Sequence, residues 1–156
     1  MKNFYKIALL VFISVNFCQE LLAQEEESRK KNFNVENGIL LNGYDPVSYF
    51  SNKPTKGKAA FQYKYKGIKY LFCSQANLDK FKLEPEKYEP AYGGWCAYAM
   101  GEKGEKVTIN PETFKITNGK LFVFYNSFFN NTLNEWNKDE KNLNKKADIN
   151  WKSITK

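Results

Sequence analysis

The sequence contains no histidine, and it has only three cysteines and two methionines among its 156 residues. Without histidine, the usual general base of neutral-pH catalysis is missing, together with a common zinc ligand. The chain also lacks the Cys-x-x-Cys motif of disulfide oxidoreductases, and no phosphate-binding glycine loop or Ser/Lys pair stands out. We therefore predict a non-catalytic protein, with Cys96 as the only nucleophile to consider.

Long apolar runs are also absent, apart from one short run near the N-terminus. Lys2 and Lys6 form a basic start, and residues 7–15 are apolar. A Leu-Leu-Ala tripeptide then ends at Ala23. This layout is typical of a secretory signal peptide, and the run is too short to span a bilayer. We expect residues 1–23 to be a signal peptide cleaved near Ala23, so that the protein is exported, periplasmic or secreted. A retained membrane anchor is the alternative.

Cleavage at that point would remove Cys18 and leave Cys73 and Cys96. Lipidation of Cys18 is disfavoured because the three residues before it lack the small side chains of a lipoprotein processing site. The stretch "QEEESRKKN" has no apolar residue to bury, so we expect residues 24–37 to form a disordered tether. Residues 38–156 are then one domain.

The net charge is +7 and falls only to +6 without the leader, because the leader holds two lysines and one glutamate. The lysines are spread along the chain, which is typical of a solvated surface with weak affinity for an anionic membrane surface. Nucleic-acid binding needs a basic stripe with exposed aromatic residues, and export argues against it. We therefore expect no nucleic-acid partner.

Aromatic residues make up 17% of the chain and indicate the fold. In "FQYKYKGIKYLF", aromatic and polar residues alternate on both sides of Lys66-Gly67, which predicts a hairpin. Its expected pairs are Tyr65 with Ile68, Tyr63 with Tyr70, and Phe61 with Phe72. Asn118-Gly119 predicts a second hairpin, which pairs Ile116 with Leu121 and Phe114 with Val123. Its second strand is apolar on both faces and is expected to be central in the sheet.

Helical segments are expected between and after the hairpins. Ser74 can cap a helix that carries Leu78 and Phe81, and a further turn begins at Pro85. "WCAYAM" should be helical until Gly101. One C-terminal helix is predicted with an apolar face formed by Phe129, Leu133, Trp136, Leu143 and Ala147, followed by a docked Trp151. The whole predicts a small α+β domain in which two β-hairpins form an antiparallel sheet packed by short helices and a C-terminal helix.

Several segments resemble the exported YHS domain-containing proteins. They are "NGYDPVSYF", "GIKYLFCSQANLDKFKLEPEKYEPAYGGWCAYAM", "PETFKITNGKLFVFY" and "KKADINW", so the resemblance runs from about residue 38 to residue 151. It implies a relation to small heavy-metal-associated modules, found beside copper transport machinery, in which cysteines after a β-hairpin hold metal. A metal-transport or envelope protein is the partner that the resemblance implies.

The sequence departs from those modules at one position. In those modules, a strand ends in Phe-Cys-Ser, and a second cysteine follows one helical turn later. Phe72-Cys73-Ser74 is present here, but Asn77 occupies the place of the second cysteine. One soft ligand is therefore missing from the local pair.

Cys96 is the candidate to replace it. Cys96 and Met100 are four residues apart and share a face if this stretch is helical. Together with Cys73 they would form a site of two thiols and one thioether, which suits Cu(I). Zinc is a poorer candidate, because it usually takes four ligands and would have to recruit carboxylates such as Asp45 or Asp79. We expect copper binding, with Cys96 as the principal ligand, Cys73 second and Met100 third.

Two alternatives remain open at this point. Cys73 and Cys96 can be two inert buried thiols. They can instead form a disulfide, which would stabilise the domain by roughly 3 kcal/mol. The protein would then be an interaction domain that binds a protein or small ligand without metal. If the domain has a ligand pocket, the two irregular stretches around Tyr44 and Asp45 and around Tyr92 and Trp95 are expected to line it. Asp45 can equally serve only to cap the turn at Pro46.

Overall fold

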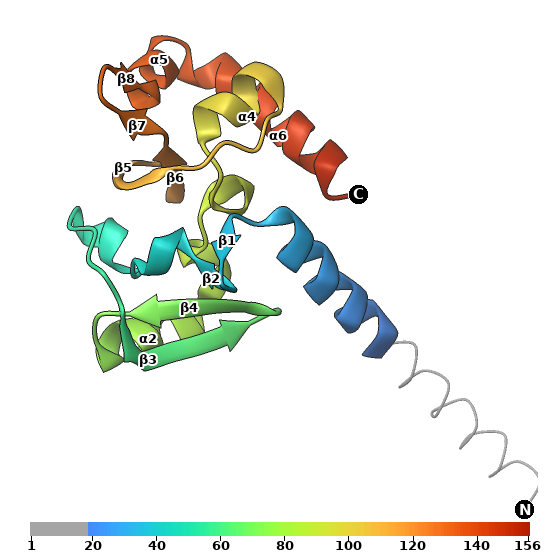
Figure 1. Cartoon of the computed structure of the whole chain (residues 1–156), viewed down its shortest axis with the longest axis vertical. Coiled ribbons are helices and arrows are strands. Elements are labelled where there is room, and N and C mark those ends of the chain that lie inside the picture. Colours follow the sequence, from blue (N-terminus) through green and yellow to red (C-terminus); the bar gives the residue numbers. More distant parts are fainter. Residues whose placement is uncertain (1–18) are drawn as a thin grey trace, which may run out of the picture.

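Figure 1 shows the computed structural model, which describes residues 19–156. The strands are β1 (Val35–Glu36), β2 (Ile39–Leu40), β3 (Lys58–Tyr65), β4 (Ile68–Phe72), β5 (Asn110–Thr117), β6 (Lys120–Phe124), β7 (Asn126–Ser127) and β8 (Asn130–Asn131). The helices are α2 (Gln75–Leu83), α3 (Pro85–Tyr88), α4 (Ala97–Lys103), α5 (Thr132–Lys138) and α6 (Glu140–Ile154), with short 3-10 turns at Leu41–Gly43, Ser48–Ser51 and Ala91–Gly94. The predicted α+β class is confirmed.

The first hairpin, β3–β4, forms as the alternation predicts. Lys66 and Gly67 both have positive φ, 44° and 81°, as a tight two-residue turn requires. Tyr65 pairs with Ile68 and Tyr63 with Tyr70, as predicted. The third pair is wrong, because a bulge between Lys58 and Gln62 shifts the register and places Lys58 opposite Phe72. This hairpin belongs to a four-stranded sheet of order β1-β2-β4-β3, in which β2 and β4 are parallel.

The second hairpin, β5–β6, has both predicted pairs, Ile116 with Leu121 and Phe114 with Val123. It is a separate two-stranded sheet, so the prediction of one antiparallel sheet built from both hairpins is wrong. Strand β6 is buried on both faces, as predicted, but its second edge is covered by irregular chain. Isolated bridges there join Pro90 to Leu121 and Cys96 to Val123, which explains how an apolar strand of a two-stranded ribbon escapes solvent.

Two groups of buried side chains form the core. One surrounds Phe81 of α2, which contacts the rings of Tyr70 and Phe72 at centroid distances of 4.7 and 5.2 Å. The other surrounds Trp136, which contacts Phe122 and Phe124 at 5.5 and 5.6 Å. Figure 1 accordingly shows β3, β4 and α2 at one end of the molecule and β5, β6 and helices α4 to α6 at the other.

The C-terminal region is two helices rather than one, with a break at Asp139 between α5 and α6. Trp136 and Ala147 are fully buried, as the apolar pattern predicts, whereas Phe129 precedes α5 and is fully exposed. Helix α4 also continues past Gly101 to Lys103 and is capped by Gly104, which has a φ of 70°. A β-carbon on Gly101 would lie 2.6 Å from the carbonyl oxygen of Leu143, so this glycine permits close packing of α4 on α6.

The region expected to be a disordered tether differs in the structure, because residues 19–32 are helical. Arg29 forms an ion pair with Glu89, donates to the carbonyl of Lys66 and stacks on the ring of Phe33 with its guanidinium carbon 4.2 Å from the centroid. Tyr70 donates a further hydrogen bond to Glu89. Glu25 and Glu26 also form ion pairs, with Lys66 and Lys64. These contacts attach the segment to the domain, and its polar composition does not reveal them.

The predicted signal peptide, residues 1–23, lies mostly outside the described residues. Within residues 19–156, no helix combines the length and the apolar character needed to cross a membrane.

Candidate functional site

The carboxylate of Asp45 lies at the centre of the first candidate site and has no exposed surface. Its Oδ1 accepts hydrogen bonds from the backbone N–H groups of Val47 at 2.8 Å and Ser48 at 3.4 Å. Its Oδ2 accepts from the backbone N–H of Cys73 at 2.9 Å and from the side-chain amide of Asn77 at 2.7 Å. Four N–H donors thus compensate the buried charge.

This arrangement follows from the local sequence. Pro46 follows Asp45 and ends the extended segment, so that the Asp45 carboxylate can cap the turn at Val47 and Ser48. Ser74 is the N-cap of α2, and its hydroxyl accepts from the N–H of Asn77 at 3.2 Å. The side chain of Asn77 is thereby fixed over the end of β4, where Cys73 lies. Asp45, Cys73 and Asn77 are called the Asp45 site below.

Cys73 is half-buried in this site, and the side-chain amide of Asn77 donates to its Sγ at 3.4 Å. Burial, and then the hydrogen bond and negative charge of Asp45, raise the pKa of the Cys73 thiol. The neutral thiol is therefore the resting form at neutral pH. A metal ion that binds there must displace this proton.

Cys96 lies elsewhere, at the N-cap of α4 and with no exposed surface. Its Sγ lies 3.3 Å from the hydroxyl oxygen of Thr132, and the Thr132 hydroxyl lies 2.8 Å from the carbonyl oxygen of Tyr125. Since a carbonyl oxygen can only accept, the Thr132 proton points to Tyr125, and the Cys96 thiol must be the donor to Thr132. Cys96 is therefore held by a hydrogen bond inside the fold.

The predicted three-sulfur site is not brought together. Met100 is one turn from Cys96, as predicted, but it is fully buried and packs in the group around Trp136. Cys73 and Cys96 are both free thiols, so the structure does not contain the alternative disulfide. Among residues 19–156, no cluster of three or more cysteine or carboxylate side chains could hold a metal ion. A resident, fully coordinated metal therefore does not fit the side chains that the structure describes.

The four residues that were predicted to line a ligand pocket make separate contacts. Tyr44 donates to Glu112 at 3.0 Å, Tyr92 donates to Asp148 at 3.0 Å, and the indole of Trp95 donates to the carbonyl of Asn32 at 2.6 Å. Asp45, the fourth, accepts the hydrogen bonds described above. They do not converge on one pocket, and the interpretation of Asp45 as a backbone cap is the one that its contacts support.

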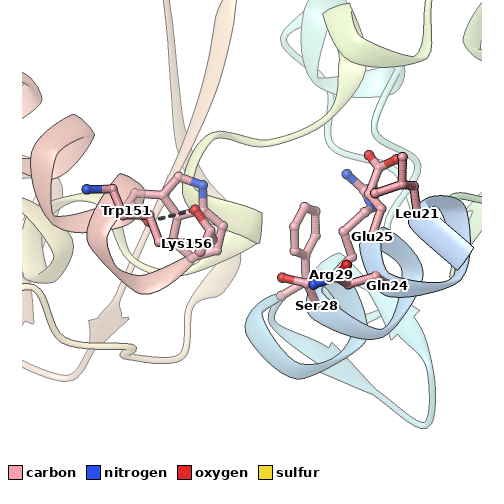
Figure 2. Close-up of a pocket in the computed structure, with 9 residues that line it drawn as sticks. Leu21, Gln24, Glu25, Ser28, Arg29, Trp151 and Lys156 are labelled. Atoms are coloured by element: carbon pink, nitrogen blue, oxygen red, sulfur yellow. Dashed lines mark hydrogen bonds between the residues drawn. The ribbon is translucent and has the colours of Figure 1, made fainter. Parts of the chain in front are cut away.

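Two of the clefts in the described part of the chain lie on either side of one aromatic pair, and another is lined by Cys96 and Thr132. Phe33 and Trp151 meet edge to face at a centroid distance of 5.9 Å. One cleft, shown in Figure 2, lies between the N-terminal helical segment and the end of α6. The second is lined by Tyr92, Gly93 and Asp148 beside the same pair. Trp151 was predicted to dock, but nothing in the sequence pairs it with Phe33.

Comparison with known proteins supplies one match. Residues 47–92 match the model of the YHS domain, a segment that contains Cys73 and Asn77 and begins two residues after Asp45. No curated protein and no solved structure matches the chain. The YHS domain is associated with metal binding, which agrees with metal handling in general and leaves the metal open.

Proposed function

This chain is a YHS domain-containing protein, and we propose that it is an exported, non-catalytic binding module that takes up a soft metal ion at Cys73. The observation that supports this site is the position of Cys73. It lies at the end of the hairpin strand within the matched segment, it is the more accessible of the two described thiols, and it adjoins the carboxylate of Asp45. We do not include Cys96 and Met100 among the proposed ligands, because both side chains are fully buried.

Copper is the metal that this donor set suits best. One thiol cannot complete the tetrahedral coordination that zinc prefers, whereas Cu(I) accepts soft donors in low coordination number. A metal held by one protein sulfur exchanges readily, so we treat copper as cargo. A metal-transport or envelope protein would supply the second sulfur.

The test is a Cu(I) competition titration in the presence of a small thiol. We expect Cys73→Ser to abolish binding, while Cys96→Ser leaves the affinity unchanged, because serine can still donate to Thr132. Since binding displaces a proton whose pKa is raised, the affinity of the wild-type chain should increase by about tenfold per pH unit from pH 6 to 8. Copper binding that survives Cys73→Ser would contradict the proposal.

A second candidate function is a metal-free interaction domain, and the hydrogen bonds of Asn77 favour it. The residue in the place of the second metal ligand donates to Asp45 at 2.7 Å and thereby stabilises the fold. On this alternative, neither Cys73→Ser nor added copper would alter the binding of the partner protein or ligand. The titration above separates the two candidates.

A further inference from the structure

Two adjacent phenylalanines project fully into solvent at the tip of the β7–β8 hairpin. Phe128 has a relative exposure of 98% and Phe129 of 106%. They form the turn between Ser127 and Asn130, which are paired across the hairpin. Burying a phenylalanine side chain is worth about 1.5–3 kcal/mol, so two of them left in water need an explanation beyond the fold.

The two short strands that carry the tip are polar and contain no acidic residue. Asn126, Ser127, Asn130 and Asn131 form a collar of amide and hydroxyl groups directly below the two rings. Glu102 and Glu105 line a cleft that reaches Asn130, so the acidic side chains nearest the collar lie on and after α4 and not on the hairpin itself. The chain as a whole carries a net charge of +7.

An apolar tip, a hydrogen-bonding collar and a positive net charge together match the profile of a lipid bilayer surface. Aromatic side chains partition into the boundary between headgroups and acyl chains, and the collar can bind headgroup oxygens. Anionic lipids attract a protein of positive net charge. We propose that the Phe128–Phe129 tip inserts into the interface of an anionic membrane and attaches this protein to that surface.

The shape of the tip alone does not tell whether it binds a membrane or a protein partner, and the net charge of the chain is the better guide. A second copy of the chain could also receive the two rings, and it would carry the same positive charge. Like-charge repulsion between copies disfavours that pairing, whereas an anionic bilayer is attracted. Self-association is therefore the outcome that the experiment must separate from membrane binding.

The experiment measures co-sedimentation with vesicles of phosphatidylcholine and phosphatidylglycerol in equal parts, and with phosphatidylcholine alone. The test variant is Phe128→Asn with Phe129→Ser, since Phe128 has a φ of 48° and asparagine tolerates this conformation. The matched control is Leu83→Ser, which removes another exposed apolar side chain, 83% exposed, on α2 at the other end of the molecule. The wild type and all variants are compared with the same N-terminus, so that the apolar residues 7–15 contribute equally to vesicle binding.

We expect the double variant to lose at least about tenfold in partitioning to the anionic vesicles, while the control matches the wild type. Binding of the wild type should weaken with phosphatidylcholine alone and with added salt. Phe129→Trp should give indole fluorescence that is quenched by brominated lipid. Thermal unfolding should be unchanged in the double variant, because the two rings bury nothing.

Three results would overturn the inference. The first is equal sedimentation of the wild type and the double variant, and the second is failure of the wild type to bind either vesicle. The third is a wild-type dimer that the double variant converts to a monomer without any change in vesicle binding, which would assign the tip to a second copy of the chain.

Discussion

Asn77→Cys is expected to raise the affinity of this protein for Cu(I), and for Zn(II), by at least about a hundredfold. The side-chain amide of Asn77 lies 3.4 Å from Cys73 Sγ and 2.7 Å from Asp45 Oδ2. A thiol placed there would lie one helical turn from Cys73 and within reach of the carboxylate. The Asp45 site would then hold two thiolates and one carboxylate, instead of one thiol.

The measurement is a competition titration against a chelator of known affinity, for both metals. Asn77→Ala is the matched control, because it removes the same two hydrogen bonds without adding sulfur. We expect Asn77→Ala to lose some stability and gain no metal affinity. If the Asn77→Cys protein has two titratable free thiols and still binds no more tightly than the control, the Asp45 site does not have the geometry of a metal site.

That outcome also bears on the proposed function. If wild-type Cys73 takes up copper only weakly and Asn77→Cys restores tight binding, the natural asparagine is what makes the site an exchange site rather than a storage site. If the wild type binds no copper at all, the same gain would mean that Asn77 has a structural role at this position in the natural chain. The metal-free interaction domain would then be the better account.

The two hairpins could be predicted from the sequence because local rules determine them. Lys66-Gly67 and Asn118-Gly119 supply the positive φ angles of tight turns, and the flanking alternation fixes the pairs next to them. The prediction failed at Phe61, where a bulge between Lys58 and Gln62 shifts the register. It also failed in joining both hairpins into one sheet, because pairing between distant strands leaves no periodic signal.

Phe129 shows a second limit of sequence patterns. Its spacing to Leu133 and Trp136 fits a helix, but Asn131 caps α5 and starts it after Phe129. The capping residue therefore outweighs the apolar period, and a residue expected in the core is fully exposed. Arg29 shows the converse, since its ion pair with Glu89, 60 residues away, depends on tertiary contact alone.

The candidate site could be predicted in its parts but not in its assembly. Cys73 and Asp45 were both identified as candidate residues, and the structure connects them through the backbone N–H of Cys73 and the amide of Asn77. For Asn77, the sequence indicated only that a cysteine of the metal-binding modules is absent at this position. A short polar side chain at the fourth position after Cys73, with a buried aspartate elsewhere, does not by itself specify a hydrogen bond.

Asp45→Ala is expected to lower the free energy of unfolding by about 3 kcal/mol or more. Removing the buried carboxylate leaves the N–H groups of Val47 and Cys73 and the amide of Asn77 without their acceptor. Those contacts join the 45–48 turn, the end of β4 and the start of α2, so their loss affects three elements together. Typical domains have only 5–15 kcal/mol of stability, and the melting temperature should fall by about 10 °C or more.

Urea unfolding followed by tryptophan fluorescence measures this effect, and Glu112→Ala is its control. Glu112 is an exposed carboxylate that accepts one hydrogen bond, from Tyr44 at 3.0 Å, so its removal should cost less than about 1 kcal/mol. Equal losses in the two variants would mean that the four donors around Asp45 find other acceptors after its removal. The Asp45 carboxylate would then not be what joins the 45–48 turn, the end of β4 and the start of α2.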